Sequence, residues 1–233
     1  MNKKLLILGA KGQAKLIIDA VASCQSEYTD IALLDSFADY SHLLSYPIIG
    51  RCDDLESFRD RYTHGFVSMA DPVIRKYFLE RLIKAGYEIP NIVHPTAHVS
   101  DYALLDVGIF IDANASIAPD SRIGIGCVCH AGVRIAHDNE ISNYSAIAPN
   151  ACTNGYVNVG NGSFIGSCSC IINNTNVGSN VVVAAGSVVT SHIADNVLVA
   201  GSPAKVKKQI AQIKYSVWPA TYGKEDGSTR RDG

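Results

Sequence analysis

An apolar or small residue recurs at every sixth position from Val99 to Val189, through sixteen consecutive hexads and without an insertion. A second small or branched residue precedes most of these positions by two. A strict period of six excludes an α-helix, because a 3.6-residue turn would carry the apolar stripe off any one face within two hexads. Plain strand alternation would need turn signals between the strands. The repeat therefore predicts a parallel β-helix, in which three short strands and about eighteen residues make one triangular coil.

Every third hexad then stacks on itself, which divides the inward positions into three columns. The first column comprises Val99, Ile117, Ile135, Thr153, Ile171 and Val189. The second comprises Leu105, Ile123, Ile141, Val159 and Val177, and the third comprises Ile111, Cys129, Ile147, Ile165 and Val183. The residue after an inward position is often Gly, Asp, Ala or Asn, and we expect positive φ there, at the corners of the coil. Glycine examples are Gly124, Gly160, Gly166 and Gly178.

The composition is that of an ordinary globular protein, with 47% apolar residues, 18% charged residues and a net charge of -2 over 233 residues. No basic patch indicates nucleic-acid binding, and no apolar run is long enough for membrane insertion. The apolar run after Lys4 breaks at Gly9 and is followed by Lys11 and Lys15. We interpret it as a buried strand of a cytoplasmic protein rather than a signal peptide.

Seven cysteines invite a disulfide or zinc interpretation. Cys127 and Cys129 fall at inward positions of the repeat, whereas Cys168 and Cys170 flank an inward serine and have no His or Cys partner at ligand spacing. We therefore expect free thiols in a reducing compartment, some of them acting as small hydrophobic side chains, and no metal.

Residues 1–92 alternate strands and helices, which predicts a Rossmann-like α/β domain. The expected elements are strands at 5–8, 31–34 and 67–70 and helices at 14–23 and 73–85. Asp71 and Pro72 mark the start of the second helix, with proline at its first position. Residues 93–207 would form the β-helix, and residues 208–233 a polar C-terminal tail.

The α/β domain carries a candidate nucleotide site. The turn from Gly9 to Gln13 offers backbone N–H groups at a helix N-terminus, which suits a phosphate or diphosphate. Lys15 stands where the full dinucleotide fingerprint has its third glycine. Asp35, at the end of the second strand, can accept a hydrogen bond from a base or a ribose hydroxyl. Each feature alone also fits a tight turn or a solvated carboxylate, but together they favour a nucleotide.

The coil carries a candidate catalytic pair, His137 and Asp138. His137 lies two residues past an inward position, so it projects near a corner. One coil later the same place is Gly155, which leaves space beside the imidazole. A neutral histidine with an adjacent carboxylate suits general-base chemistry near pH 7, although a solvated corner histidine has the same spacing. His130 also faces a corner, but no acidic residue follows it.

Residues 1–207 resemble the sugar acetyltransferases of the sialic acid O-acetyltransferase and bacillosamine N-acetyltransferase (NeuD/PglD-like) type. The resemblance rests on the hexapeptide array, His137 with its acidic neighbour, the glycine turn, Leu34-Asp35 and the closing Gly201-x-Pro-Ala-Lys205. It implies a nucleotide-sugar-binding α/β domain, a left-handed β-helix, a homotrimer and acetyl-CoA as co-substrate. The flat sides of a prism also suit cyclic assembly.

The resemblance also implies roles for individual residues. His137 would be the general base that takes a proton from the sugar amine or hydroxyl, and Asp138 the acidic residue that assists it. The implied nucleotide-sugar contacts are Lys11, Gly12, Gln13, Asp35, Ser36, Ala70 and Asp71. The implied acetyl-CoA contacts are Ala146, Gly155, Ser167 and Ala185. The family commonly has histidine where this chain has Gln13 and Ala146, so the first change suits another sugar or nucleotide and the second removes a contact near the thioester.

The expected reaction is N-acetylation of a nucleotide-linked 4-amino-4,6-dideoxy sugar for surface-glycan synthesis, by direct attack on acetyl-CoA. Two alternatives stay open: O-acetylation of sialic acid or another surface sugar, and a scaffold that binds the nucleotide sugar without catalysis. A metal enzyme of the carbonic anhydrase type is not favoured, because it needs three histidine ligands and no such set is within reach of His137.

Overall fold

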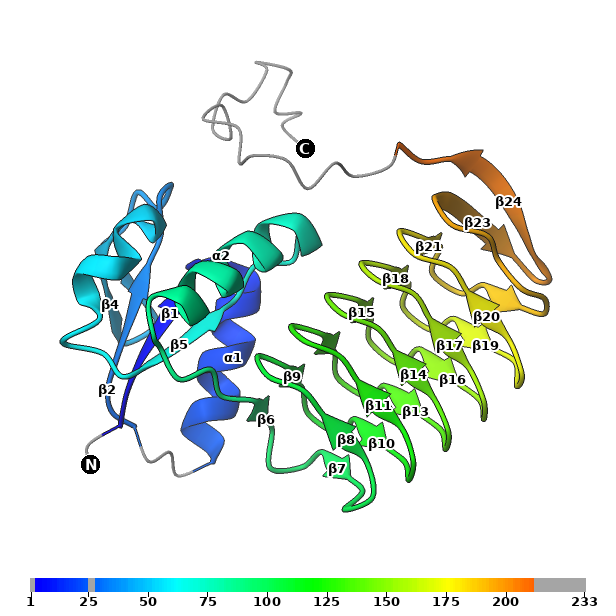
Figure 1. Cartoon of the computed structure of the whole chain (residues 1–233), viewed down its shortest axis with the longest axis horizontal. Helices are drawn as coiled ribbons and strands as arrows, with labels where there is room; N and C mark the ends of the chain where they lie inside the picture. The colour runs from blue at the N-terminus through cyan, green and yellow to red at the C-terminus, as the bar shows by residue number, and fades with distance from the viewer. Residues whose placement is uncertain (1–2, 25–27, 212–233) are drawn as a thin grey trace, which may run out of the picture.

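The computed structural model describes residues 3–24 and 28–211 and shows an α/β domain followed by a β-helix (Figure 1). The α/β domain contains β1 (Lys3–Leu8), α1 (Gly12–Ser23), β2 (Tyr28–Leu34), β3 (His42–Leu43), β4 (Tyr46–Gly50), the 3₁₀ helix η1 (Cys52–Phe58), β5 (His64–Val67) and α2 (Pro72–Lys84). Within the described residues, no helix is long and apolar enough to cross a membrane.

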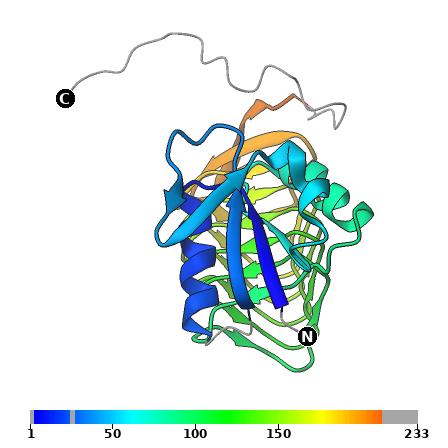
Figure 2. The same ribbon diagram turned by 90° about the vertical axis from the view of Figure 1, so that its left-hand side faces the viewer.

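The strands of the α/β domain form one sheet of order β3-β4-β2-β1-β5, in which only the β3–β4 pair is antiparallel. Leu5 to Leu8 are 0% exposed, as expected for a parallel sheet covered on both faces. Figure 2 views this domain with α1 beside the strands and the coils behind them. The carboxyl ends of β1, β2 and β5 meet at one edge, where ligands bind in open α/β sheets.

The β-helix is built from strands of two residues, one for each hexad. They are β6 (Ile92–Val93), β7 (His98–Val99), β8 (Leu104–Leu105), β9 (Phe110–Ile111), β10 (Ser116–Ile117), β11 (Arg122–Ile123), β12 (Val128–Cys129), β13 (Arg134–Ile135), β14 (Glu140–Ile141), β15 (Ala146–Ile147), β16 (Cys152–Thr153), β17 (Asn158–Val159), β18 (Phe164–Ile165), β19 (Cys170–Ile171), β20 (Asn176–Val177), β21 (Val182–Val183) and β22 (Val188–Val189). A hairpin of β23 (Val197–Gly201) and β24 (Ala204–Gln209) closes the far end.

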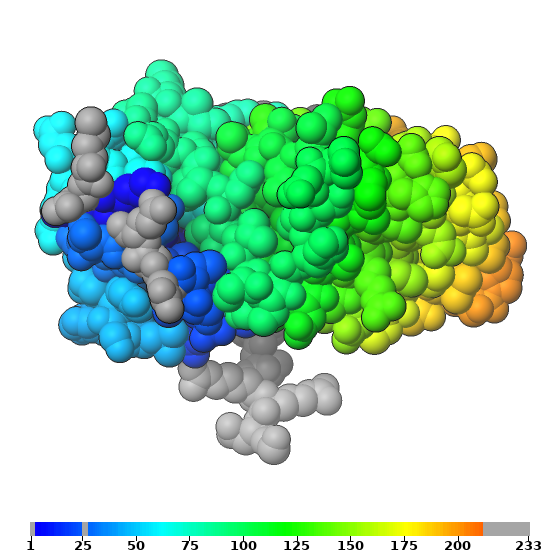
Figure 3. All heavy atoms as spheres, turned by 90° about the horizontal axis from the view of Figure 1, so that it is seen from below, coloured from blue at the N-terminus to red at the C-terminus, as the bar shows by residue number. Residues whose placement is uncertain are grey.

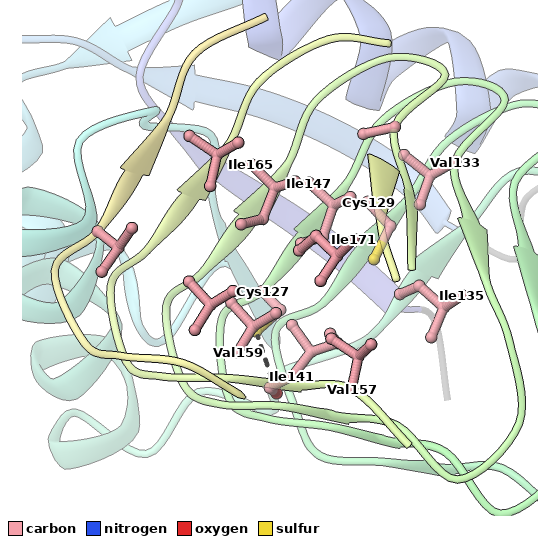
Figure 4. Close-up of a cluster of buried hydrophobic side chains, with 14 of the residues drawn as sticks. Cys127, Cys129, Val133, Ile135, Ile141, Ile147, Val157, Val159, Ile165 and Ile171 are labelled. Carbon is pink, nitrogen blue, oxygen red and sulfur yellow. Dashed lines mark hydrogen bonds between the residues drawn. The ribbon is translucent and has the colours of Figure 1, made fainter. Parts of the chain in front are cut away.

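The strands stack into three parallel sheets, and these confirm the three predicted columns. Face 1 runs from β7 to β22, face 2 from β8 to β20, and face 3 from β6 to the closing hairpin. Ile117, for example, pairs with Ile135, which pairs with Thr153 in the next coil. The inward side chains fill the prism as one apolar core (Figure 4).

The corners correct the expectation about positive φ. The left-handed conformation occurs three residues after the inward position, as at Asn114, Asp138 and Asn150, rather than one residue after it. Glycine directly after the inward position is explained by close stacking instead. A Cβ on Gly124 would lie 2.8 Å from the backbone nitrogen of Asn143 in the next coil.

Buried hydroxyl and thiol groups complete the interior. Three serines donate hydrogen bonds of 2.8 Å to a carbonyl oxygen fifteen residues later and so tie successive coils together; the pairs are Ser121–Ala136, Ser145–Gly160 and Ser163–Gly178. All seven cysteines are free, and Cys127 and Cys129 lie in the apolar core, as predicted.

The α/β domain packs against the outer side of face 3 over its first coils. Phe110 and Val128 point outward from the prism, yet they are 0% and 3% exposed because this domain covers them. Phe164 continues the same outward column and is 43% exposed. In Figure 3 the first coils lie against the α/β domain, and the closing hairpin lies at the opposite end.

Element boundaries differ from the expectations in the α/β domain. The last strand was expected at 67–70, but β5 spans His64–Val67, because His64 and Gly65 pair with β1. The hairpin of β3 and β4 and the helix η1 were not predicted. The structure has regular strand up to Gln209, whereas most of the predicted tail, residues 212–233, lies outside the described residues. The division at residues 92 and 93 stays a prediction; β6 begins at Ile92.

Candidate active site

A cavity of about 330 Å³ lies at the carboxyl ends of β1, β2 and β5. Its lining residues are Gly9, Lys11, Gly12, Gln13, Asp35, Phe37, Ser68, Met69, Ala70, Asp71 and Ile74. Six of the seven predicted nucleotide-sugar contacts are among them. The seventh, Ser36, borders a small adjoining cavity that shares Asp35 and Phe37. A larger cavity, of about 470 Å³, includes Lys3, His64 and Glu88 and contains none of the predicted residues.

The first turn of α1 is suited to an anion. Lys11 is the N-cap residue but makes no side-chain cap, and the first turn has no acidic residue. Its backbone N–H groups are therefore open to a phosphate, whose charge the helix dipole favours. A Cβ on Gly12 would meet nothing within 4 Å, so a ligand has room to approach. Nε2 of Gln13 is buried and has no hydrogen-bond partner in the described structure.

The two aspartates of the cavity shape its walls. One carboxylate oxygen of Asp35 accepts from the backbone nitrogen of Ala10 at 2.7 Å, and the other accepts from Phe37 and the following residue. Asp71 caps α2 by accepting from Val73 and the next backbone nitrogen at 2.8 and 3.2 Å. Both side chains therefore hold backbone segments in place. Asp71 stands at the helix start that the sequence predicted, whereas the role of Asp35 was not predicted.

Arg75 on α2 links this cavity to the β-helix. It is 2% exposed and donates to four main-chain carbonyl oxygens. Two belong to Met69 and Ala70 of the cavity wall, and two to Gly126 and Tyr144 at neighbouring corners of the coil, at distances of 2.6 to 2.8 Å. Burial lowers the pKa of Arg75 to about 10, so the guanidinium keeps its charge at neutral pH. Sequence reasoning missed this residue, because nothing in an amphipathic helix marks one arginine as buried.

His137 and Asp138 form a hydrogen-bonded pair at the corner between face 1 and face 2. Nδ1 of His137 lies 2.8 Å from Oδ2 of Asp138, and the two side chains are 56% and 38% exposed. A carboxylate only accepts hydrogen bonds, so in this pair Nδ1 carries the proton and Nε2 has its lone pair free. Nε2 is then able to take a proton from a bound group.

The imidazole occupies the space above Gly155. A Cβ added to Gly155 would lie 2.6 Å from Cε1 and 2.8 Å from Nε2 of His137, so any larger residue would push the ring away. The ring of Tyr156 meets the imidazole edge to face, with the ring centroids 5.3 Å apart. The backbone nitrogen of Tyr156 also donates to the carbonyl oxygen of His137.

Asn139 anchors the backbone beneath this pair. Its side chain is 2% exposed, and its amide nitrogen lies 2.7 to 2.9 Å from the carbonyl oxygens of Ala136, His137 and Asn154. Sequence reasoning missed Asn139, although a signal existed. It stands two residues before an inward position, a register that otherwise holds small or apolar residues and hydroxyl groups.

His130 differs from His137 in its surroundings. Burial lowers the pKa of its imidazole, Asp112 in the preceding coil opposes this shift, and Arg75 adds to it. No hydrogen bond joins its ring to a carboxylate among the described contacts, so it lacks the arrangement of His137.

The predicted acetyl-CoA contacts lie in three places on the chain. Gly155 is beneath His137 at one edge of the prism. Ser167 and Ala185 lie one coil apart at another edge, between face 3 and face 1, where the carbonyl of Ser167 accepts from the backbone nitrogen after Ala185. Ala146 lies on the outer side of face 3, packed in part against the α/β domain. One copy of the chain does not bring these positions together.

Comparison with known proteins fits this arrangement. Residues 4–82, which carry the cavity, match the PglD N-terminal domain family. GDP-perosamine N-acetyltransferase from Escherichia coli is 32% identical over 101 residues, covering 43% of this chain and 46% of that enzyme. A serine acetyltransferase from Buchnera aphidicola is 27% identical over 162 residues, covering 62% of this chain and 59% of that enzyme. The chain thus matches about half the length of these curated relatives.

Solved structures extend the match over both domains. The acetyltransferase domain of PglB from Neisseria gonorrhoeae, in complex with acetyl coenzyme A, is 30% identical, with a TM-score of 0.85 over 88% of this chain and 100% of that domain. The chain belongs to the PglD-like family of sugar acetyltransferases. Its β-helix is therefore left-handed. PerB from Caulobacter crescentus, in complex with CoA and GDP-perosamine, is 29% identical, with a TM-score of 0.84 over 88% of this chain and 97% of that one.

The candidate catalytic pair of this PglD-like acetyltransferase lies outside the matched N-terminal domain. His137 and Asp138 lie in the β-helix, at the corner between face 1 and face 2, whereas the α/β domain that contains the cavity packs against face 3. Among residues 3–24 and 28–211, no group of three or more His, Cys, Asp or Glu side chains is placed to hold a metal ion.

Proposed function

We propose that this protein transfers the acetyl group of acetyl-CoA to the amine of a nucleotide-linked 4-amino-4,6-dideoxy sugar. The observation that carries the proposal is the His137–Asp138 pair, with its 2.8 Å hydrogen bond and its exposed imidazole. Family membership supports the acetyl donor, and PerB, whose complex contains CoA and GDP-perosamine, supports the nucleotide sugar. Lys11, Gly12 and Gln13 would hold the diphosphate at the start of α1.

The chemical step needs only placement and proton removal, since a thioester is already activated. The sugar nitrogen attacks the thioester carbonyl, the new C–N bond forms, and the C–S bond breaks. Nε2 of His137 takes the proton that the nitrogen loses and passes it to the departing CoA sulfur. Asp138 keeps the ring in the required tautomer and stabilises the imidazolium. Holding both substrates together replaces a bimolecular encounter with a nearly unimolecular attack.

The separation of the two halves of the site supports a homotrimer. The cavity lies on the face 3 side of the prism, whereas His137 lies at the corner between face 1 and face 2. The implied acetyl-CoA contacts are likewise divided between the edge of Gly155 and the edge of Ser167 and Ala185. Cyclic packing of three copies would bring the different edges of neighbouring chains together. We infer that each active site is shared between subunits.

A single substrate screen distinguishes an amine acceptor from a hydroxyl acceptor. Thiol release from acetyl-CoA is measured with UDP-, GDP- and dTDP-linked 4-amino sugars and with CMP-linked or free sialic acids. The proposal expects release with an amino sugar only. Release with sialic acids would indicate an O-acetyltransferase instead. Nucleotide-sugar binding without thiol release would indicate a non-catalytic scaffold.

Substitution of the base tests the mechanism. His137→Ala should reduce turnover by about 10²- to 10⁴-fold, the usual contribution of a general base. Asp138→Asn keeps a hydrogen-bond acceptor but removes its charge, so about a tenfold loss is expected. Sedimentation should show the wild-type oligomer for both variants. A folded trimeric His137→Ala protein with near-wild-type turnover would refute the mechanism, and a stable wild-type monomer would refute the shared site.

The proposal also assigns the protein to the cytoplasm and to surface-glycan synthesis. Seven free cysteines are in keeping with a reducing compartment. Fractionation of the producing cells and analysis of their glycans after gene deletion test these two assignments.

A further inference from the structure

We propose that Tyr156 is a positioning residue for His137, which holds the imidazole in the orientation that acetyl transfer requires. This inference rests on the proposed function, because it gives the ring of Tyr156 a purpose only if His137 is the base. The two rings meet edge to face, with centroids 5.3 Å apart and planes 86° apart. Such a geometry is favoured between aromatic rings.

The backbone of Tyr156 indicates that its side chain is there for a reason other than burial. Its φ is +60°, a left-handed conformation that is uncommon for a bulky residue. The same corner holds Asp120, Asp138 and Asn174 in the equivalent positions, which are residue types that tolerate this conformation. Tyr144 also adopts it, but Tyr144 is 9% exposed and packs against the α/β domain, whereas Tyr156 is 54% exposed.

The remaining contacts of His137 leave the ring one main freedom. Its backbone carbonyl is fixed by hydrogen bonds from Tyr156 and Asn139, and Gly155 lies directly beneath the ring. What is left is rotation about the side-chain bonds. A half-turn of the ring about the Cβ–Cγ bond would exchange Nδ1 with Cδ2 and Nε2 with Cε1, and so remove Nδ1 from Asp138. The ring of Tyr156 stands in contact with the imidazole and opposes this rotation.

The expected effect on kcat is moderate, because an edge-to-face ring pair adds little interaction energy beyond that of the surface it buries. Loss of the Tyr156 ring should lower kcat about two- to tenfold. The KM for acetyl-CoA and the KM for the nucleotide sugar should stay within about twofold of wild type, since Tyr156 is not among the residues assigned to either substrate.

Three variants separate positioning from other roles. Tyr156→Asn removes the ring and introduces a residue that tolerates positive φ, so the corner should keep its shape. Tyr156→Phe keeps the ring and should keep kcat. Tyr102→Asn controls for the loss of an exposed tyrosine, since Tyr102 lies at the same corner three coils earlier and is 74% exposed. It should leave kcat unchanged.

A spectroscopic readout tests the contact without turnover. The Cε1 proton of His137, assigned by its loss in His137→Ala, should shift in the NMR spectrum of Tyr156→Asn, because the ring current of Tyr156 disappears. It should not shift in Tyr102→Asn. An unmoved signal in Tyr156→Asn, or a raised nucleotide-sugar KM with normal kcat, would overturn the proposal. If the signal shifts while His137→Ala remains fully active, the contact is real but the proposed function fails, and the positioning role with it.

Discussion

The guanidinium of Arg75 donates a 2.6 Å hydrogen bond to the carbonyl oxygen of Tyr144, across the boundary between the two domains. The same guanidinium reaches the wall of the cavity through Met69 and Ala70. One buried side chain thus ties the cavity wall to the coil, beside the apolar contacts of Phe110 and Val128. No carboxylate neutralises it within salt-bridge distance in the described residues, so its charge is balanced by four carbonyl dipoles.

Replacement of Arg75 with methionine should destabilise the protein strongly. The carbonyls of Gly126 and Tyr144 would each lose a donor, and an unsatisfied buried acceptor costs about 1–3 kcal/mol. We expect the free energy of unfolding in urea to fall by about 2–6 kcal/mol. Lys76→Met on the same helix removes an i,i+4 ion pair with Glu80 and should cost less than about 1 kcal/mol. Equal effects for the two variants would contradict the role of Arg75.

Gly155→Ala should inactivate the protein without unfolding it. The new methyl group would lie 2.6 Å from Cε1 of His137, and the exposed imidazole is free to move away. A displacement of about 1 Å at a catalytic group can cost about 100-fold in rate. The expected result is therefore a loss of that order in kcat at an unchanged melting temperature. Wild-type turnover would show that the ring position does not matter.

Gln13→Glu should weaken binding of the nucleotide sugar specifically. The buried Nε2 donor is replaced by a carboxylate oxygen next to the expected diphosphate, and like charges repel. We expect KM for the nucleotide sugar to rise at least about tenfold and KM for acetyl-CoA to stay unchanged. Lys15→Gln makes the same change in net charge outside the cavity and serves as the control. Equal rises in both variants would point to a general effect of charge.

His130 should make stability depend on pH. Burial lowers the pKa of its imidazole below the ordinary value of about 6.5, so as the pH falls the unfolded chain binds the proton first. The free energy of unfolding should therefore decrease below about pH 6.5, until the folded imidazole is also protonated. His130→Gln should show less of this decrease in urea titrations at pH 8 and pH 5. If the difference in free energy of unfolding between wild type and His130→Gln is the same at pH 8 and pH 5, His130 is not the cause of the pH dependence.

The architecture of the β-helix was predictable from the sequence, because a period of six with two inward positions has few solutions. Each predicted column appears as a strand stack with the expected register. The same counting located His137, because the position two residues after Ile135 lies outside the core. The α/β domain was less predictable. Its last strand begins with His64 and Gly65, which carry no apolar alternation, so the strand was placed three residues late.

The contacts that organise the site could not be read from residue type. Asp35 and Asp71 follow strands at the edge where ligands bind, which suggested that their carboxylates contact a ligand. In the fold, both carboxylates accept hydrogen bonds from backbone N–H groups. Arg75 looks like any charged residue of a surface helix until α2 is packed against the coil. Tyr156 looks like an exposed corner residue until the ring of His137 is placed beside it. These roles depend on tertiary packing, which a periodic pattern does not encode.

Within the β-helix, each coil stacks on the coil before it and the coil after it, tied by hydrogen bonds such as that from Ser163 to Gly178. The molecule is therefore adjustable in length by whole steps. Insertion of one complete coil between His137 and the closing hairpin would lengthen the prism by about 4.8 Å. All existing side chains would keep their orientation. Evolution can in this way change the distance between His137 and the closing hairpin, to suit a long co-substrate, without disturbing the catalytic corner.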